Sequence, residues 1–280
     1  MRQEAPKSPG EIVSAHNSAH NSAHPRGSAR SPAKQRRRPV IAIDGPAGAG
    51  KSTLAAHLAR RFGFLNLETG AMYRALALKA IESDFSFDEE APLLALAEST
   101  RIDLQPQLEG NRVLLDGMDV SRRIREGDVT SAASQISVHP RLRAWMVEEQ
   151  RALGAQGGIV MEGRDIGTAV FPDAEVKIFL DAAPEVRGNR RFRQAVPAEL
   201  TTARQTKSRQ EPDAETAEQQ RAARQAVLEE MRERDRRDRS RAESPLRPAT
   251  DAVILDSTAM TLEEVLAEAE RIVREHLPPG

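Results

Sequence analysis

The chain of 280 residues carries 41 Lys and Arg against 42 Asp and Glu, and it contains no cysteine. Its length allows one large domain or two small ones, and a hydrophobic content of 39% argues against disorder of the whole chain. The lack of cysteine excludes disulfides, thiolate metal sites and a cysteine nucleophile. Because there is also no apolar run of about 18 residues, we expect a cytoplasmic protein without a membrane partner.

Residues 1–38 form a basic, low-complexity tail that we expect to be disordered. They contain eight Lys and Arg and two Glu, a net charge of +6, and only three Val, Ile, Leu or Met residues. Three of the six histidines fall in a four-residue repeat, Ser-Ala-His followed by Asn or Pro, which begins at Ser14. A metal-binding tract and drift in a tolerant tail both explain the repeat. The second explanation is favoured because histidines in a flexible chain fix no geometry.

The folded part is expected to begin at Pro39, with strands and helices in alternation. Val40 to Ile43 is a short β-branched apolar run that predicts a buried strand, and the apolar spacing from Ser52 to Phe62 predicts a helix. This alternation indicates an α/β fold, with a P-loop NTPase-type parallel sheet flanked by helices. The further central strands that we expect are 159–161, 176–180 and 252–255, and the further helices are 71–82, 129–153, 184–193 and 261–276.

Two stretches interrupt the alternation. Residues 101–122 predict short antiparallel strands, with turns at Glu109-Gly110-Asn111 and Asp116-Gly117. Residues 194–241 are rich in Gln, Ala, Glu and Arg and have few large apolar side chains. We therefore expect that stretch to be a polar, exposed and mobile helical segment.

One segment matches the phosphate-binding P-loop, in which Gly, four residues and Gly-Lys-Ser follow one another: Gly45-Pro46-Ala47-Gly48-Ala49-Gly50-Lys51-Ser52. The glycines let backbone N–H groups cradle phosphate oxygens at a helix N-terminus. Lys51 would neutralise the β- and γ-phosphates, and the Ser52 hydroxyl would bind Mg²⁺. A plain glycine-rich turn would explain the glycines but not the Lys-Ser pair.

Three further segments carry candidate phosphate ligands. Thr69 can cap a helix in which Arg74 lies one turn further on. Arg164 and Asp165 follow a predicted strand, at the sheet edge where α/β proteins bind ligands. A dense basic stretch runs from Arg234 to Arg241. A single surface arginine is usually solvated or ion-paired, but arginines from three distant segments near a P-loop indicate a clamp on two polyanions. The chain has neither the Asn-Lys-x-Asp motif of GTPases nor the aliphatic run ending in Asp-Glu of ATPase motors.

These segments together resemble bacterial cytidylate kinases, a family of P-loop nucleoside monophosphate kinases. The similarity extends from about Val40 to the C-terminus, with the motifs in order. The motifs that carry it are Asp44-Gly45-Pro46-Ala47-Gly48-Ala49-Gly50-Lys51, Thr69-Gly70-Ala71-Met72-Tyr73-Arg74, Ala133-Ser134-Gln135, Pro140-Arg141-Leu142-Arg143, Gly163-Arg164-Asp165-Ile166-Gly167-Thr168, Phe171-Pro172-Asp173-Ala174 and Arg234-Asp235-Arg236-Arg237-Asp238-Arg239.

The resemblance implies an enzyme and its architecture. ATP as co-substrate and CMP or dCMP would give ADP and CDP or dCDP, with Mg²⁺, in a kinase domain over residues 39–280. Within it, residues 96–131 would form an insert that binds the monophosphate, and residues 184–241 would form a lid with an Arg-rich end. We expect small-molecule substrates, no nucleic-acid partner and a monomer.

The resemblance also implies roles for individual residues. Arg74, Arg164 and Arg241 would hold the CMP phosphate. Arg234 and Asp238 would contact the ribose. Ser134, Arg143 and Asp165 would read cytosine, and Thr69 would be a further substrate-binding residue. The ATP site would consist of Gly45, Pro46, Ala47, Gly48, Ala49, Gly50, Lys51, Ser52, Thr53 and Arg190. The catalytic residues would be Lys51, Arg191 and Arg241, and Arg187 would lie with Arg190 and Arg191 in the lid.

Asp165 is the residue whose chemistry separates cytosine from uracil. Its carboxylate can accept a hydrogen bond from the 4-amino group of cytosine but would face the O4 acceptor of uracil. A helix cap or an ion pair with Arg164 is the alternative role for Asp165. Ser134 and Arg143 have equally ordinary alternatives, a serine on a helix surface and a solvated arginine.

The chain departs from the family pattern at a few positions. Ser52 follows Lys51 where some members have Gly, Thr69 stands where Ser is common, and Glu162 stands where Asp is common. Residues 194–231 are longer and more polar than expected. Two other functions stay open: a P-loop kinase for UMP or another small substrate, and a nucleic-acid-binding P-loop ATPase, which the basic tail would suit.

Overall fold

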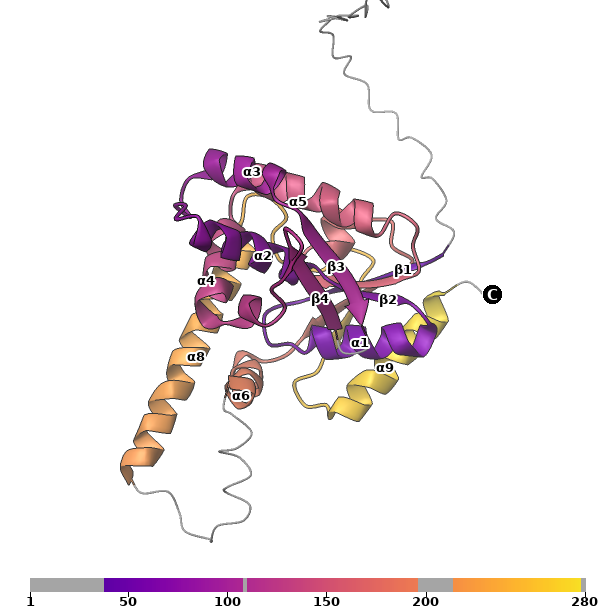
Figure 1. Cartoon of the computed structure of the whole chain (residues 1–280). Helices are drawn as coiled ribbons and strands as arrows, with labels where there is room; N and C mark the ends of the chain where they lie inside the picture. Colours follow the sequence, from indigo (N-terminus) through magenta and orange to yellow (C-terminus); the bar gives the residue numbers. More distant parts are fainter. Residues whose placement is uncertain (1–37, 108–109, 196–213, 278–280) are drawn as a thin grey trace, which may run out of the picture. The chain divides into compact units, whose positions relative to one another are not determined.

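The computed structural model describes residues 38–107, 110–195 and 214–277 (Figure 1). Five strands form a parallel sheet in the order β2-β6-β1-β7-β8. The strands are β1 (Val40–Asp44), β2 (Leu65–Glu68), β6 (Ile159–Gly163), β7 (Val176–Asp181) and β8 (Val253–Asp256). A parallel sheet flanked by helices confirms the predicted fold class. The prediction that 252–255 is a central strand is wrong, because β8 lies at an edge and leaves Ile254 exposed.

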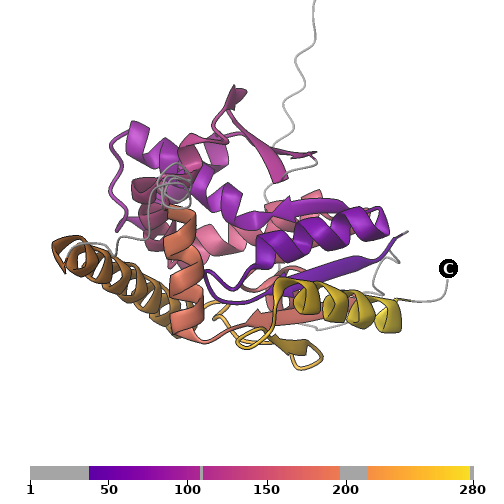
Figure 2. The same cartoon turned by 90° about the horizontal axis from the view of Figure 1, so that it is seen from below.

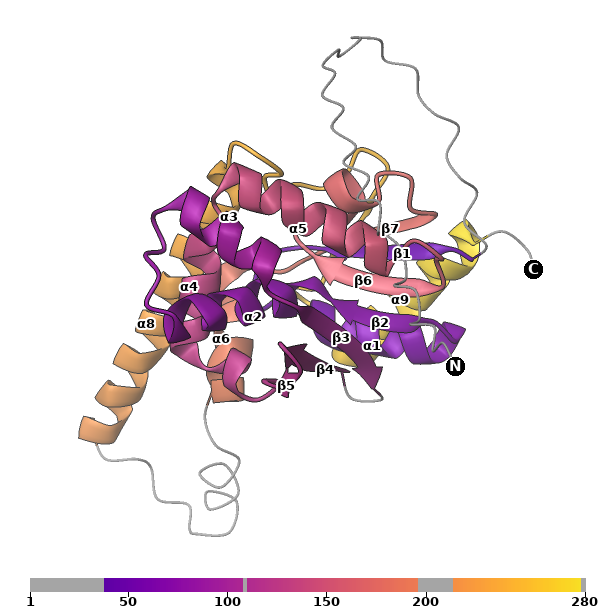
Figure 3. The ribbon, with the colours of Figure 1, turned by 45° about the horizontal axis from the view of Figure 1, so that its top comes forward.

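Helices cover both faces of this sheet. They are α1 (Lys51–Phe62), α2 (Thr69–Glu82), α3 (Glu90–Ser99), α4 (Gly127–Ile136), α5 (Pro140–Leu153) and α9 (Leu262–His276). Ile41 and Ile43 of β1 belong to a hydrophobic cluster with α1 and α9 (Figure 2). Val40 and Ala42, which point to the other face, belong to a second cluster with α2, α4 and α5 (Figure 3). Burial on both faces explains why β1 is apolar throughout.

The single helix expected over 129–153 is two helices, α4 and α5. The first ends at Ile136 and the second starts with Pro140 in its first turn. Proline suits the first turn of a helix, but it disfavours the helical conformation in the residue before it, so the chain breaks here. The elements β2 and α3 were not predicted, because both are short and offer little periodicity.

The interruption over 101–122 is a small antiparallel sheet, as predicted, in the order β3-β4-β5. Its strands are β3 (Ile102–Gln107), β4 (Gly110–Leu115) and β5 (Met118–Asp119). The predicted turn at Asp116-Gly117 joins β4 to β5, and both residues have positive φ, 49° and 86°. That geometry is typical of a tight hairpin turn. The other predicted turn lies partly outside the described residues.

The small sheet lies beside β2 (Figure 3), and the buried side chain of Asn111 in β4 bonds to that strand. Its Oδ1 accepts a hydrogen bond from the backbone N–H of Glu68 at 2.8 Å, and its Nδ2 donates to the carbonyl of Asn66 at 2.7 Å. Since β2 is an edge strand, the amide supplies the donor and the acceptor that a further strand would supply.

The polar stretch 194–241 is helical in its described part. Helix α6 (Pro184–Ala195) packs against the long helix α8 (Ala214–Ser240), and residues 196–213 lie outside the described residues. The expectation of an exposed segment is wrong for the C-terminal half of α8, where Met231, Asp235 and Asp238 are buried. Ion pairs rather than an apolar stripe account for burial of the two acids, as the site shows below.

The predicted disordered tail lies outside the described residues, apart from Arg38. The Arg38 guanidinium donates to the carbonyl of Gly63 at 2.8 Å and lies 5.2 Å from the centre of the Phe64 ring. Arg38 therefore contacts the loop that joins α1 to β2. In the ranges that the structure describes, no helix is long and apolar enough to cross a membrane.

Candidate active site

The P-loop joins β1 to α1, as the sequence predicts. Gly45, Gly48 and Gly50 all have positive φ, which favours glycine. At Gly45 a side chain is also excluded by space, since a Cβ atom would lie 2.0 Å from the carbonyl oxygen of Leu180. The loop therefore brings its backbone to the start of α1, where the N-terminal N–H groups attract anions.

Lys51 is the first residue of α1, and its ammonium group is buried beside this loop. Its Nζ donates to the carbonyl of Pro46 at 2.8 Å, and the residue is 6% exposed. Burial, together with the positive charges of Arg164 and Arg234, lowers the pKa of Lys51 to about 7. A buried cation with other cations around it marks a place where a polyanion would be stabilised.

Two carboxylates end neighbouring strands next to the P-loop. Glu68 of β2 and Glu162 of β6 are partners in the parallel register, and both are buried. The Ser52 hydroxyl donates to Glu162 at 2.5 Å. Burial and the charge of Glu68 raise the pKa of Glu162. Mg²⁺ prefers oxygen ligands, so the Ser52 hydroxyl and the Glu162 carboxylate fit this ion. In the described ranges, no group of three or more His, Cys, Asp or Glu offers a metal site.

Glu68 also pairs with two arginines, Arg74 of α2 and Arg125, which lies in a short helical turn before α4. Arg74 donates to one carboxylate oxygen of Glu68, and Arg125 lies 3.5 Å from the other. These pairs, Arg74 above all, lower the pKa of Glu68 against the effect of burial. The prediction that Thr69 caps α2 is wrong, because Glu68 is the N-cap residue and the Thr69 hydroxyl donates to the carbonyl of Glu162 at 2.8 Å.

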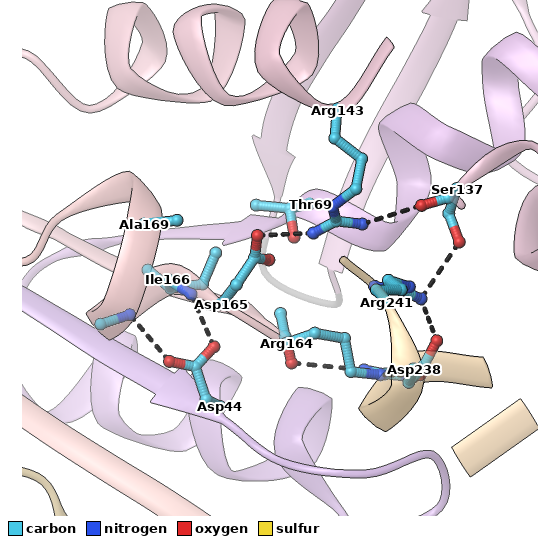
Figure 4. Close-up of polar contacts among 12 residues, drawn as sticks. Asp44, Thr69, Ser137, Arg143, Arg164, Asp165, Ile166, Ala169, Asp238 and Arg241 are labelled. Atoms are coloured by element: carbon cyan, nitrogen blue, oxygen red, sulfur yellow. Dashed lines mark hydrogen bonds and ion pairs between the residues drawn. The ribbon is translucent and has the colours of Figure 1, made fainter. Parts of the chain in front are cut away.

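Asp165 forms a buried ion pair with Arg143 of α5 (Figure 4). A guanidinium nitrogen of Arg143 donates to Asp165 Oδ2 at 2.5 Å, and a second donates to the carbonyl of Ser137 at 3.1 Å. Arg143 is 2% exposed, so it is not the solvated arginine of the alternative reading. Neither alternative for Asp165 holds, since its side chain caps no helix and its partner is not Arg164.

Ser134 is buried rather than on a helix surface. The residue is 4% exposed, and its hydroxyl has no hydrogen-bond partner among the residues that the structure describes. A buried polar group without a partner costs free energy, so this hydroxyl is suited to a ligand that completes its hydrogen bonding.

The C-terminal end of α8 supplies the remaining charged groups. Asp238, which is 1% exposed, accepts from Arg164 at 2.9 Å and also pairs with Arg241 (Figure 4). Arg241 reaches the Ser137 hydroxyl at 3.1 Å. Burial and the charge of Arg164 lower the pKa of Arg234 to about 10. Arg164, Asp238 and Arg241, which lie at or just after the ends of β6 and α8, are thus held in one network.

The arginines of α6 differ in what they contact. Arg187 is buried, pairs with Asp235 at 2.7 Å and donates to the P-loop carbonyl of Ala47 at 3.0 Å. Arg190 donates to Ala49 O at 3.1 Å and to Ser257. Arg191 is exposed. Arg187 therefore joins α6 to α8 and to the P-loop, whereas Arg191 has its guanidinium accessible.

Most of these groups line one cavity of about 900 Å³. The predicted site residues that line it are Ala47, Gly48, Ala49, Gly50, Lys51, Ser52, Thr53, Thr69, Arg74, Ser134, Arg143, Arg164, Asp165, Arg190, Arg191, Arg234, Asp238 and Arg241. Only Gly45 and Pro46 of the predicted set are absent from its lining. The structure thus brings together side chains from segments that are nearly 200 residues apart.

A family model for cytidylate kinase matches residues 41–275. The chain belongs to the cytidylate kinase family. The cytidylate kinase of Aeromonas salmonicida (strain A449) is 45% identical over 229 residues, which cover 82% of this chain and 91% of that protein. The cytidylate kinase of Geobacter sp. (strain M21) is 42% identical over 242 residues, covering 86% of this chain and 95% of that protein. Shikimate kinase from Acinetobacter baumannii is a structural neighbour at 13% identity and a TM-score of 0.33, covering 86% and 93% of the two chains. That superposition carries no argument about activity.

Glu68, Tyr73, Arg125 and Glu162 are among the cavity residues of this cytidylate kinase family member that were not predicted as site residues. Glu68 and Glu162 each stand at or next to the end of a buried strand, which is a signal that the sequence offers. Tyr73 lies under the Arg143 guanidinium, 5.7 Å from ring centre to Cζ. That contact joins two helices, and no pattern within either of them predicts it.

Proposed function

We propose that this chain transfers the γ-phosphoryl group of ATP to CMP or dCMP, giving ADP and CDP or dCDP. The observation that carries the proposal is that the P-loop and the Asp165–Arg143 pair open onto the same cavity. Membership of the cytidylate kinase family supports it. Arg234 of α8 and Arg241, just after that helix, line the same cavity, which favours a nucleotide site over a surface for nucleic acid.

The ATP half of the site is proposed to be the P-loop, Gly45 to Thr53, with Arg190 beside it. The N-terminal N–H groups of α1 and the ammonium of Lys51 would hold the phosphates. Ser52 and Glu162 would hold Mg²⁺, which when bound neutralises phosphate oxygens. Arg191, an exposed residue that lines the cavity, would approach the phosphoryl group during transfer.

The monophosphate half is proposed to lie between β6, α2 and α8. Arg74, Arg164 and Arg241 would bind the CMP phosphate, with Thr69 beside them. In the structure each of these arginines already has a carboxylate partner, Glu68 or Asp238. The carboxylates orient the guanidinium groups before the phosphate arrives, so less side-chain entropy is lost on binding. Arg234 and Asp238 would contact the ribose.

Cytosine is proposed to be read by Asp165, Arg143 and Ser134. The Asp165 carboxylate accepts a hydrogen bond from the 4-amino group, whereas the O4 of uracil would meet it as a second acceptor. Arg143 holds the carboxylate in place. The Ser134 hydroxyl, which is buried and open to a partner, would complete the contacts to the base.

The reaction needs no covalent intermediate. The chain would align the two phosphates and stabilise the charge on the phosphoryl oxygens with Lys51, Arg191 and Arg241. Water must be excluded to prevent ATP hydrolysis, and we assign this to a lid over residues 184–241 and to the insert over residues 96–131. A monomer in the cytoplasm stays a prediction.

The proposal is tested by incubating the chain with ATP, CMP and Mg²⁺ and separating the products by ion-exchange chromatography. ADP and CDP should form in equal amounts, and a chelator should stop the reaction. Lys51→Met should lose nearly all turnover. ADP release that does not depend on CMP, with no CDP formed, would show an ATPase instead.

A further inference from the structure

The backbone directly after Asp165 forms a single wide turn, Ile166–Val170, of π-helical geometry. The Asp165 carbonyl accepts from the N–H groups of Ala169 at 2.8 Å and Val170 at 3.2 Å. One turn leaves its first N–H groups and its last carbonyl groups without partners inside the turn. Partners for both ends must come from other elements.

Asp44 supplies the partners at the start of the turn (Figure 4). Its Oδ1 accepts from the N–H of Ile166 and its Oδ2 from the N–H of Gly167, both at 2.7 Å. Asp44 ends β1, next to Gly163 in the sheet register, and is 4% exposed. A Cβ at position 167 would lie 3.2 Å from Lys177 Cδ and 3.4 Å from Asp44 Oδ2, so there is little space for a side chain beside this contact.

Arg151 supplies the partners at the end of the turn. Its Nε donates to the carbonyl of Val170 at 3.0 Å, and a terminal nitrogen donates to the carbonyl of Ala169 at 2.6 Å. An acid at the start and a base at the end complement the dipole of the turn. Arg151 lies on α5, the helix that also carries Arg143, so α5 contacts both the Asp165 side chain and the end of its turn.

Burial of the Asp44 carboxylate carries a free-energy cost, which its hydrogen bonds to the turn oppose. Burial raises the pKa of Asp44 to about 7, and the hydrogen bonds from Gly167 and Ile166 oppose that rise. Asp44 precedes the P-loop directly, yet within the described part of the chain its carboxylate accepts hydrogen bonds from the turn and not from the loop.

We propose that Asp44 and Arg151 are positioning residues that hold the turn Ile166–Val170, and through it fix Asp165 where it separates cytosine from uracil. This inference rests on the proposed function. Rejection of uracil requires that Asp165 cannot withdraw from the O4 atom, because a carboxylate free to move would relieve the repulsion. Asp44 and Arg151 supply that rigidity from outside the base site.

The test compares kcat and KM for CMP, UMP and ATP in the wild-type chain and in Asp44→Asn and Arg151→Ala. An amide at position 44 keeps one acceptor and sets an NH₂ group against a backbone N–H. We expect the ratio of kcat/KM for CMP to that for UMP to fall about tenfold in Asp44→Asn and about threefold in Arg151→Ala. The change should appear as a higher KM for CMP, with the KM for ATP within about twofold.

Two control variants match these changes away from the site. The Glu175 carboxylate accepts the N–H of Val40 at 2.7 Å at the other end of β1, so Glu175→Gln alters the same kind of contact. Arg271 pairs with Glu268 and Glu275 on α9, so Arg271→Ala removes a surface arginine of similar exposure. Both controls should keep the CMP to UMP ratio, whatever they do to the melting temperature. Since the Arg151 side chain is 43% exposed, Arg151→Ala should fold even where Asp44→Asn does not.

Two outcomes overturn the inference. An unchanged CMP to UMP ratio in Arg151→Ala and in any folded Asp44→Asn would show that the contacts of Asp44 and Arg151 with the turn serve stability alone. A higher KM for ATP with an unchanged KM for CMP would show that Asp44 positions the P-loop and not the turn. Failure of the wild-type chain to phosphorylate CMP would overturn the proposed function, and this inference with it, so the two failures are distinguished by the wild-type reaction.

Discussion

At the scale of single residues, the site contains four arginines that pair with carboxylates before any nucleotide binds. Glu68 pairs with Arg74, Asp238 pairs with Arg164 and Arg241, and Asp165 pairs with Arg143. A buried arginine without a partner would be costly, so these acids make an arginine-rich cavity compatible with a stable fold. Two of these acids, Asp165 and Asp238, are also proposed to contact the substrate.

Asp165→Asn should remove the discrimination between cytosine and uracil. An amide presents both a donor and an acceptor, so it no longer repels the O4 of uracil. We expect kcat/KM for CMP to fall about 10- to 100-fold while that for UMP does not fall. The ratio is measured, because loss of the Arg143 partner will also lower stability. Asp88→Asn, at an exposed position, is the control and should leave the ratio unchanged.

Lys51 should take up a proton when ATP binds. With a pKa of about 7 in the free chain, the Lys51 amine is mostly neutral at pH 8, and phosphate charges favour its protonated form. Calorimetry of ATP binding at pH 8, without Mg²⁺ and in buffers of different ionisation enthalpy, should report uptake of about one proton or less. In Lys51→Met the uptake should vanish. Equal uptake in both chains would assign the proton to another group.

At the scale of elements, α8 is held by acids on its inner side. Asp235 pairs with Arg187 of α6, and Asp238 pairs with Arg164 after β6, so the last turns of α8 link two other elements. The helix has few large apolar side chains, and these buried pairs take the place of an apolar face.

Asp238→Ala should therefore lower stability strongly. It leaves Arg164 and Arg241 without their carboxylate, and breaking such a buried pair costs about 3–5 kcal/mol. The free energy of unfolding in urea would measure this loss. Glu233→Ala removes a surface carboxylate from the same helix, next to Arg236 and Arg237, and should cost much less. Equal losses in the two variants would contradict this account of α8.

The same pair predicts an acid dependence of stability. Arg164 and Arg241 lower the pKa of Asp238 in the folded chain despite its burial. An acid with a lowered folded pKa contributes its full stability above its unfolded pKa, about 4, and loses it as the pH falls through the folded value. The free energy of unfolding, measured between pH 6 and pH 3, should therefore fall less with decreasing pH in Asp238→Ala than in the wild-type chain.

Which elements could be predicted depends on the distance between the residues that decide them. The strand β1, the P-loop and α1 follow from adjacent residues, and the structure agrees closely with the predicted bounds. The break before Pro140 has a local cause in the proline itself, whereas the burial of Asp238 depends on its contact with Arg164, which is distant in the chain. The contact of Asp44 with Ile166 spans 122 residues, and no periodicity reports it. The site residues were named from a resemblance, whereas their ion-pair partners required coordinates.

At the scale of the whole molecule, charge is distributed unequally. The sequence of residues 39–280 has a net charge of −7, and residues 1–38 have +6. The acidic surplus accompanies a cavity lined by arginines from α2, β6, α6 and α8. Phosphate binding in this chain therefore depends on local pairing and not on net charge.

Removal of residues 1–36 should leave the reaction unchanged. The family match begins at residue 41, and Arg38, which contacts Gly63 and Phe64, is retained in the shortened chain. We expect kcat/KM for CMP to stay within about twofold. A large loss of CMP turnover, or steeply salt-dependent RNA binding by the full chain that competes with CMP, would give the tail a part in function.

The most direct test of the central claim is a comparison of kcat/KM for CMP, dCMP, UMP, AMP and shikimate, with ATP and Mg²⁺ held constant. The account predicts that CMP or dCMP is the best acceptor and that UMP is about 10- to 100-fold poorer, since the Asp165 carboxylate rejects its O4 atom. A preference for UMP, AMP or shikimate over both cytidine nucleotides would contradict it.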